Sequence, residues 1–94
     1  MTKLKIIYES QFKRDYKTAK KRGLNLERMV EVIEMLANCI PLPPKFRDHK
    51  LENSRKYKDM RECHIEPNWL LVYQIVDDAL VLRLVRTGTH SDLF

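Results

Sequence analysis

The chain has 94 residues, enough for one domain with a small core, and its 44% hydrophobic content argues against disorder. Eighteen Lys and Arg against thirteen Asp and Glu give a formal charge of +5, which favours a polyanionic partner because neutralised phosphates release their counterions. Two cysteines are too few for a disulfide scaffold, and without a recognisable signal peptide or a membrane-length apolar stretch we expect a cytoplasmic protein with no membrane partner.

The amino-terminal part predicts a strand followed by a basic helix. Residues 3–8 are rich in β-branched residues and end in tyrosine, which favours a strand. A helix is expected over residues 10–22, with Ser10 as its N-cap. Lys13 and Lys17 lie on a basic side of this helix, which either is a solvated surface or follows a phosphate backbone.

A second helix is predicted to begin after an N-cap at Asn25 and to continue to Ile40. Apolar residues recur there at helical spacing, which indicates an amphipathic helix. Cys39, near its end, is interpreted as a small core residue. Prolines then end the helix and open a basic loop that contains His49 and Lys50.

Further along the chain the hydrophobic period changes to two, and strands are predicted over residues 57–65, 69–76 and 79–87. The middle strand is nearly all apolar, as expected for a strand covered on both faces. Alternation along the first of these strands places Glu62 and His64 on the same face.

The order of elements is therefore β-α-α-β-β-β. This order predicts an α+β domain in which a helical hairpin packs on a mostly antiparallel, twisted sheet. The sequence contains no repeat or linker, so we expect a single domain over residues 1–94.

All three histidines fall in the second half of the chain: His49 in the basic loop, His64 in a strand, and His90 just beyond the last strand. Histidine exchanges protons near neutral pH, and cleavage of RNA needs a base for the 2′-hydroxyl and an acid for the departing 5′-oxygen. Cations are also needed to hold the charge of the phosphorane. The further candidates are one acid and three cations, namely Glu62, Arg86, Lys50 and Arg61.

Each candidate also has a plainer interpretation. A single histidine is more often a hydrogen-bonded surface residue than a catalytic one. Glu62 and His64 share a strand face and are candidates for a pair of metal ligands, but no residues match the spacings of zinc sites, so we expect no bound metal. Phe94, an aromatic residue four positions after His90, is expected either to hold down the end of the chain or to stack on a base.

Four sequence blocks in the second half resemble a known family. They are FRDHKL at residues 46–51, RECHIEP at residues 61–67, LLVY at residues 70–73 and RTGTHSDLF at residues 86–94. Together they resemble the YafQ-type mRNA interferases, which are toxins of the RelE/ParE superfamily. The basic amino-terminal helix pair also belongs to that fold, so the resemblance covers the whole chain.

The resemblance implies a ribosome-dependent endoribonuclease that cuts mRNA in the aminoacyl site and stops translation, with no metal or other cofactor. It also implies a cognate antitoxin that silences the toxin, and contact with operator DNA only through the antitoxin complex. Two alternatives remain open. One is a ParE-like toxin of the same fold that acts on DNA gyrase by contact, and the other is a non-catalytic, nucleic-acid-binding co-repressor.

The resemblance assigns a role to each candidate residue. Proton transfer falls to three histidines and one acid, namely His49, His64, His90 and Glu62. Among these, His90 is the leading acid or base. Arg86 matches the residue that stabilises the phosphate in the transition state, and Phe94 matches a terminal aromatic residue that orients the substrate.

Two positions depart from the pattern of some relatives. Glu62 stands where they carry Asp, which keeps the charge and changes the reach of the carboxylate. Asn68 also stands where they carry Asp, and because an amide cannot exchange protons at neutral pH, its expected role is positional. The residues expected to bind substrate are Lys13, Lys17, Lys50, Arg61 and Asn68.

Overall fold

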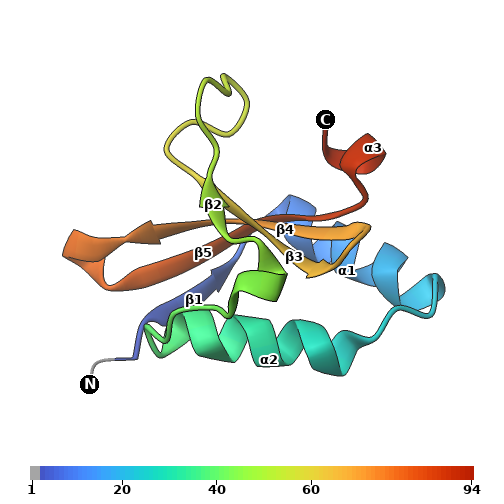
Figure 1. Cartoon of the computed structure of the whole chain (residues 1–94), viewed down its shortest axis with the longest axis horizontal. Coiled ribbons are helices and arrows are strands. Elements are labelled where there is room, and N and C mark those ends of the chain that lie inside the picture. Colours follow the sequence, from blue (N-terminus) through green and yellow to red (C-terminus); the bar gives the residue numbers. More distant parts are fainter. Residues whose placement is uncertain (1–2) are drawn as a thin grey trace.

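A computed structural model describes residues 3–94, which form a five-stranded mixed sheet with two long helices against one face (Figure 1). The strands lie in the order β1-β5-β4-β3-β2, where β1 is parallel to β5 and the other neighbours are antiparallel. The predicted α+β class with a mostly antiparallel sheet is confirmed, and the short edge strand β2 was not predicted. The strands are β1 (Lys5–Tyr8), β2 (His49–Lys50), β3 (Arg61–Glu66), β4 (Trp69–Val76) and β5 (Val81–Gly88).

The helices divide between the two faces of the sheet. Helices α1 (Ser10–Lys21) and α2 (Leu26–Ala37) cover one face, and the one-turn helix α3 (His90–Leu93) lies over the other (Figure 1). The 3₁₀ turns η1 (Pro44–Phe46) and η2 (Asp77–Ala79) come before β2 and β5. Between residues 3 and 94, no helix has the length and apolar character needed to cross a membrane.

The helix ends correct two sequence predictions and confirm a third. Ser10 is the first residue of α1 rather than its N-cap; Glu9 holds the cap position and makes no side-chain capping bond. Asn25 caps α2 as predicted, because its side chain accepts a hydrogen bond from a backbone N–H of the first turn. Cys39 has a φ of 59°, which the α-helix does not allow, so α2 ends earlier than predicted and leaves Cys39 and Ile40 exposed.

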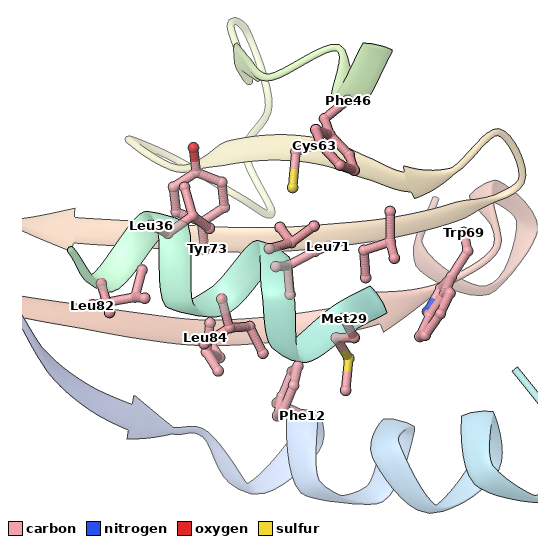
Figure 2. Close-up of a cluster of buried hydrophobic side chains, with 14 of the residues drawn as sticks. Phe12, Met29, Leu36, Phe46, Cys63, Trp69, Leu71, Tyr73, Leu82 and Leu84 are labelled. Atoms are coloured by element: carbon pink, nitrogen blue, oxygen red, sulfur yellow. The ribbon is translucent and has the colours of Figure 1, made fainter. Parts of the chain in front are cut away.

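The larger core lies between the two long helices and the sheet (Figure 2). Trp69 and Tyr73 of β4 belong to it. The indole N–H of Trp69 donates to Thr87 Oγ1 at 2.8 Å, and this hydroxyl donates to the backbone oxygen of Leu70 at 2.7 Å. The polar groups buried at this end of the core are therefore hydrogen-bonded, as buried polar groups must be if they are not to cost stability.

A smaller cluster on the opposite face holds the end of the chain against the sheet. Leu93 of α3 and Tyr57 pack with Leu70 and Val72 of β4. Strand β3 begins later than the predicted residue 57, and residues 51–60 instead form a loop on this side of the sheet (Figure 1). The face without the long helices is therefore framed by this loop and by α3.

Candidate active site

Strand β3 carries a buried carboxylate between two imidazoles. Alternation sends Cys63 and Ile65 into the larger core and leaves Glu62 and His64 on the opposite face, as predicted. The register of β2 places His49 opposite Glu62. Glu62 Oε1 lies 3.5 Å from His49 Nε2 and 3.6 Å from His64 Nε2, so one carboxylate oxygen serves both rings.

Each imidazole is also held through its other nitrogen. Nδ1 of His49 lies 2.8 Å from the backbone oxygen of Arg47, and Nδ1 of His64 lies 3.2 Å from that of Pro67. Carbonyl and carboxylate oxygens only accept hydrogen bonds, so both contacts of a ring are satisfied together when both of its nitrogens carry protons. Each ring is therefore fixed through both of its nitrogens.

Exposure increases from the carboxylate outward. The side chain of Glu62 is 7% exposed, that of His64 20% and that of His49 49%. A substrate can therefore reach the imidazoles, while Glu62 stays shielded behind them. Such shielding strengthens the interaction between the carboxylate and any positive charge on the rings.

The turn before β2 puts His49 in place. Arg47 has a φ of 47° and ends η1, which turns the chain toward the sheet edge. Asp48 is then held by Arg61, at 3.2 Å between Nη2 and Oδ2, and by the hydroxyl of Tyr73. Burial and the contact with Asp48 raise the pKa of Tyr73, which keeps this hydroxyl protonated as a donor. Arg61 was predicted to bind substrate. Its side chain instead lies on the face of the sheet opposite to Glu62 and holds the turn before β2 through Asp48.

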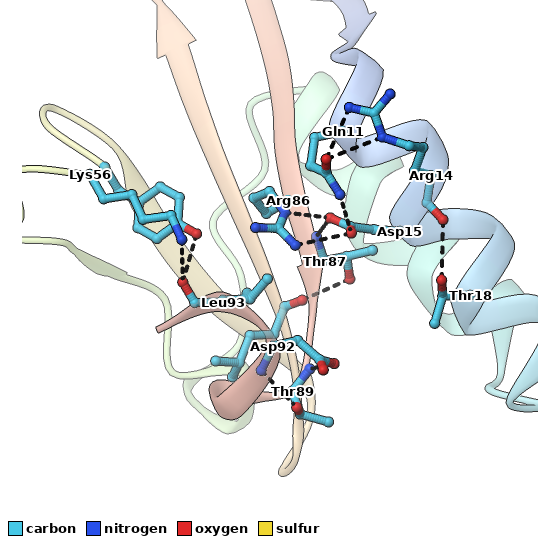
Figure 3. A network of polar contacts seen from close by, with 12 residues as sticks. Gln11, Arg14, Asp15, Thr18, Lys56, Arg86, Thr87, Thr89, Asp92 and Leu93 are labelled. Carbon is cyan, nitrogen blue, oxygen red and sulfur yellow. Dashed lines mark hydrogen bonds and ion pairs between the residues drawn. The ribbon is translucent and has the colours of Figure 1, made fainter.

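Strand β5 adds Arg86 to the same row of the sheet. Glu62 is opposite Val72, and Val72 is opposite Arg86. The Arg86 guanidinium pairs with Asp15 of α1, at 2.7 Å from Nε to Oδ2 and 3.1 Å from Nη2 to Oδ1 (Figure 3). This hydrogen bonding raises the pKa of Arg86, against the opposing effect of burial. Sequence reasoning missed Asp15, although it is the one acid within an otherwise basic helix.

His90 and Phe94 form a second group. Their ring centroids lie 4.9 Å apart, and Phe94 also meets the Tyr57 ring edge-on at 5.3 Å. His90 is the first residue of α3, whose N-cap is Thr89 with a capping box. The half-exposed Phe94 ring thus lies between a buried tyrosine and the exposed histidine.

Helix α3 is anchored from two sides. Asp92 pairs at 2.7 Å with Arg22, the C-cap residue of α1, and this contact holds the pKa of the Asp92 carboxyl well below its usual range. On the other side, the hydroxyl of Tyr57 and the ammonium of Lys56 donate to the backbone oxygen of Leu93 at 2.8 and 3.3 Å (Figure 3). The position of α3, and with it His90, therefore depends on contacts with residues that are distant in the sequence.

The two groups lie on the same face of the sheet. His64 is opposite Leu70, and Leu70 is opposite Gly88, two residues before His90. With neighbouring strands about 4.8 Å apart, the backbones at His64 and Gly88 are separated by about 10 Å. Leu93 packs on Leu70, so α3 lies over the face that carries Glu62 and His64.

The other predicted binding residues line clefts whose linings include no histidine. Lys50 lines a cleft of about 620 Å³ formed by the loop after β2. Asn68 is exposed in the turn between β3 and β4, at a cleft of about 390 Å³ that Thr89 also lines. Lys13 and Lys17 line an apolar groove of about 660 Å³ between α1, α2 and β1, on the side of the molecule that carries the long helices.

Known proteins that resemble the chain point to one family. Residues 4–94 match the model of the family described as the bacterial toxin of the type II toxin-antitoxin system, YafQ. The chain is 40% identical over 90 residues to the mRNA interferase toxin YafQ of Escherichia coli strain B, which covers 95% of this chain and 94% of that protein.

Solved structures agree with this match. A metal-bound toxin from Helicobacter pylori is 44% identical with a TM-score of 0.90, covering 97% of this chain and 99% of that one. YafQ of E. coli, in its complex with the antitoxin DinJ, is 38% identical with a TM-score of 0.86, covering 98% of each chain. Sequence and fold thus agree over almost the whole length, and the resemblance inferred from the sequence is confirmed. The chain belongs to the YafQ family of bacterial type II toxin–antitoxin toxins.

Proposed function

We propose that this toxin is an endoribonuclease that cuts mRNA on the ribosome by histidine acid–base catalysis, without a metal ion. The observation that carries the proposal is the pair of imidazoles, whose Nε2 atoms lie 3.5 and 3.6 Å from one buried oxygen of Glu62. Its E. coli relative is named an mRNA interferase. A toxin that acts by contact alone has no need of this arrangement.

The chemistry needs two proton carriers and a cation. A base takes the proton of the 2′-hydroxyl as the 2′-oxygen–phosphorus bond forms, and an acid protonates the 5′-oxygen as its bond to phosphorus breaks. The products are a 2′,3′-cyclic phosphate and a 5′-hydroxyl. In this proposal His90 and one imidazole of the His49–His64 pair carry the protons, and Arg86 binds the phosphate oxygens. Phe94, 49% exposed beside His90, stacks on a base of the substrate.

No step of the proposed reaction involves a metal ion. Among the residues that the structure describes, no group of three or more His, Cys, Asp or Glu side chains is arranged to hold one. The donors that face the Glu62 oxygen are the imidazole nitrogens that must exchange protons. We therefore expect cleavage to continue when divalent metals are chelated, under conditions that keep the ribosomes intact.

We also propose that a cognate antitoxin binds the groove between α1, α2 and β1. Three large apolar side chains are exposed there, Tyr8 at 48%, Tyr16 at 38% and Val30 at 54%, and Lys13 and Lys17 line the same groove. Exposed apolar patches with a polar rim mark protein contacts, and this rim suits an acidic amphipathic segment. Contact with operator DNA would then come only through the antitoxin, in the cytoplasm.

The test of the nuclease is cleavage of mRNA by purified toxin on ribosomes, mapped by primer extension, with and without EDTA. The variants are His90→Ala and, as a matched control on the same helix, Ser91→Ala, whose side chain is exposed. We expect new 5′ ends with the wild type and with Ser91→Ala that persist in EDTA, and none with His90→Ala. Intact mRNA in cells whose growth the wild type still arrests would contradict the proposal and favour a contact target such as gyrase.

A further inference from the structure

Asp15, the partner of Arg86, is itself held by several hydrogen bonds. Each of its two carboxylate oxygens accepts two of them. Oδ2 accepts from Arg86 Nε at 2.7 Å and from the backbone N–H of Thr87 at 3.1 Å. Oδ1 accepts from Arg86 Nη2 at 3.1 Å and from Gln11 Nε2 at 3.1 Å (Figure 3). The carboxylate therefore has a single orientation, set by its own helix and by β5.

The pairing fixes the plane of the guanidinium. Two parallel N–H···O bonds to one carboxylate constrain an arginine more than a single contact does. The side chains of Arg86 and Asp15 are only 18% and 10% exposed, so solvent does not compete strongly for these bonds. Asp15 occupies one edge of the guanidinium, whose five N–H donors include others that point away from that edge.

The row of the sheet on which Arg86 lies links this pair to the histidine site. In register, Arg86 is opposite Val72, Val72 is opposite Glu62, and Glu62 is opposite His49. Side chains in one row across neighbouring strands lie on the same face. The orientation that Asp15 gives to Arg86 is therefore an orientation relative to the imidazoles.

We propose that Asp15 is a positioning residue, which holds the Arg86 guanidinium in the orientation that binds the scissile phosphate. The inference rests on the proposed nuclease function and adds to it a residue that touches no substrate. Because a carboxylate offsets the positive charge of Arg86, the benefit of Asp15 is geometric rather than electrostatic. Its loss should slow the chemical step and leave substrate affinity nearly unchanged.

The test measures the steady-state kinetics of cleavage of ribosome-bound mRNA by Asp15→Asn. The amide keeps the shape of the side chain and an oxygen that accepts hydrogen bonds, but it turns an N–H₂ group toward the guanidinium. We expect kcat to fall between about tenfold and a hundredfold, with KM nearly unchanged, because small misplacements of a catalytic group have effects of this size. Asp15→Glu, which keeps the carboxylate, should recover part of the rate.

The chain offers a matched control in Glu9→Gln. Glu9 holds the N-cap position of the same helix and pairs with Arg83 of the same strand, at a point where β5 lies beside β1. Both substitutions remove one acid from an ion pair between the α1 region and β5. We expect Glu9→Gln to lower the thermal midpoint as Asp15→Asn does, and to leave kcat at the wild-type value.

Three further measurements separate a positioning role from a structural one. The double variant Asp15→Asn/Arg86→Ala should cleave no more slowly than Arg86→Ala, because Asp15 acts only through Arg86. The ¹⁵N-bound proton of Arg86 Nε should give a distinct NMR signal in the wild type and lose it in Asp15→Asn. Circular dichroism reports the folded fraction, and if Asp15→Asn does not fold, folded Asp15→Glu replaces it. A reduced kcat together with a shifted Nε signal in Asp15→Glu supports the positioning role, whereas a wild-type kcat together with a shifted Nε signal contradicts it.

The outcomes distinguish this inference from the function on which it rests. If the wild type leaves ribosome-bound mRNA intact, the nuclease proposal fails. If the wild type cleaves and folded Asp15→Asn cleaves at the same rate, or if the losses of the two single variants multiply in the double variant, only the positioning role is wrong.

Discussion

At the scale of single residues, Glu62 determines how the two imidazoles are arranged. Burying a carboxylate without partners costs free energy, and the side chain of Glu62 is only 7% exposed. Its two neighbours offset that cost, since His49 and His64 both turn Nε2 toward the same oxygen. The backbone oxygens of Arg47 and Pro67 hold the opposite side of each ring. Each ring is therefore held through both of its nitrogens.

Glu62→Gln tests this arrangement. An amide has the same size, but it cannot offset the charge of an imidazolium, so we expect single-turnover cleavage to fall about a hundredfold, at the low end of what acid–base catalysis contributes. Glu62→Asp, which keeps the charge with a shorter reach, should retain part of the rate. The control is Glu66→Gln, on the same strand, whose carboxylate pairs only loosely with Arg28 at 3.6 Å. A wild-type rate in folded Glu62→Gln would remove Glu62 from the mechanism.

At the scale of elements, α3 is held in place by other parts of the chain. One turn of helix is too short to be stable alone, because nucleation is unfavourable. Its capping box, the Arg22–Asp92 pair and the bonds from Tyr57 and Lys56 to its last turn supply the missing stability. Gly88 allows the close approach, since a Cβ there would lie 2.9 Å from the Asp92 carboxylate. Any loss of these contacts should release His90 and Phe94 together.

The pair between Arg22 and Asp92 predicts a dependence on pH. The pKa of Asp92 is lowered in the folded protein, mainly by the hydrogen bond from Arg22. A carboxyl with a lowered folded pKa stabilises the protein at pH values above its ordinary value of about 3.9, and this stabilisation is lost as the pH falls below that value. Urea unfolding should therefore show that Asp92→Asn is less stable than the wild type near neutral pH and that the difference shrinks in acid.

The control for that measurement is Asp78→Asn, an exposed aspartate in the turn η2. It carries the same change of charge at a position remote from α3, and it should follow the wild-type pH dependence. Equal pH dependence in Asp92→Asn and the wild type would show that the pair with Arg22 contributes nothing to folding stability.

At the scale of the whole molecule, the sheet separates two surfaces. The face with the histidines, Arg86 and α3 is open to a substrate, whereas α1 and α2 cover the other face and form the basic-edged apolar groove with β1. In the proposed function, RNA meets the first surface and the antitoxin meets the second. A folded sheet between them means that a change in one surface need not alter the other.

Val30→Glu tests this separation. The side chain is 54% exposed on α2 within the groove, so the substitution should not disturb the core, while it places a negative charge where an acidic segment is expected to bind. We expect the affinity for the cognate antitoxin to fall at least about tenfold by titration calorimetry, with mRNA cleavage unchanged. Ile40→Glu, 44% exposed and outside the groove, is the control. Equal affinities of the two variants would place the antitoxin elsewhere.

The sequence alone determined the features that depend on neighbours along the chain. Period-two alternation placed Glu62 and His64 on one face of a strand, and the apolar run over residues 69–76 marked β4 with the bounds that the structure shows. The N-cap at Asn25 was also predictable, because a cap bonds to the first turn of its own helix. Where Ser10 and Cys39 were misjudged, a local signal had to compete with backbone geometry fixed by packing.

Only the tertiary structure decided which of these residues meet. His49 reaches Glu62 because η1 and the contacts of Asp48 direct the chain into the short edge strand β2. A strand of two residues is too short to be predicted from hydrophobic periodicity. Asp15 meets Arg86 from 71 residues away, and Arg22 meets Asp92 from 70. Periodicity and caps arise from interactions within a few residues, whereas these pairs exist because the helices and the sheet pack on one core. The candidate residues could therefore be read from the sequence, but their partners are set by the packing of the whole chain.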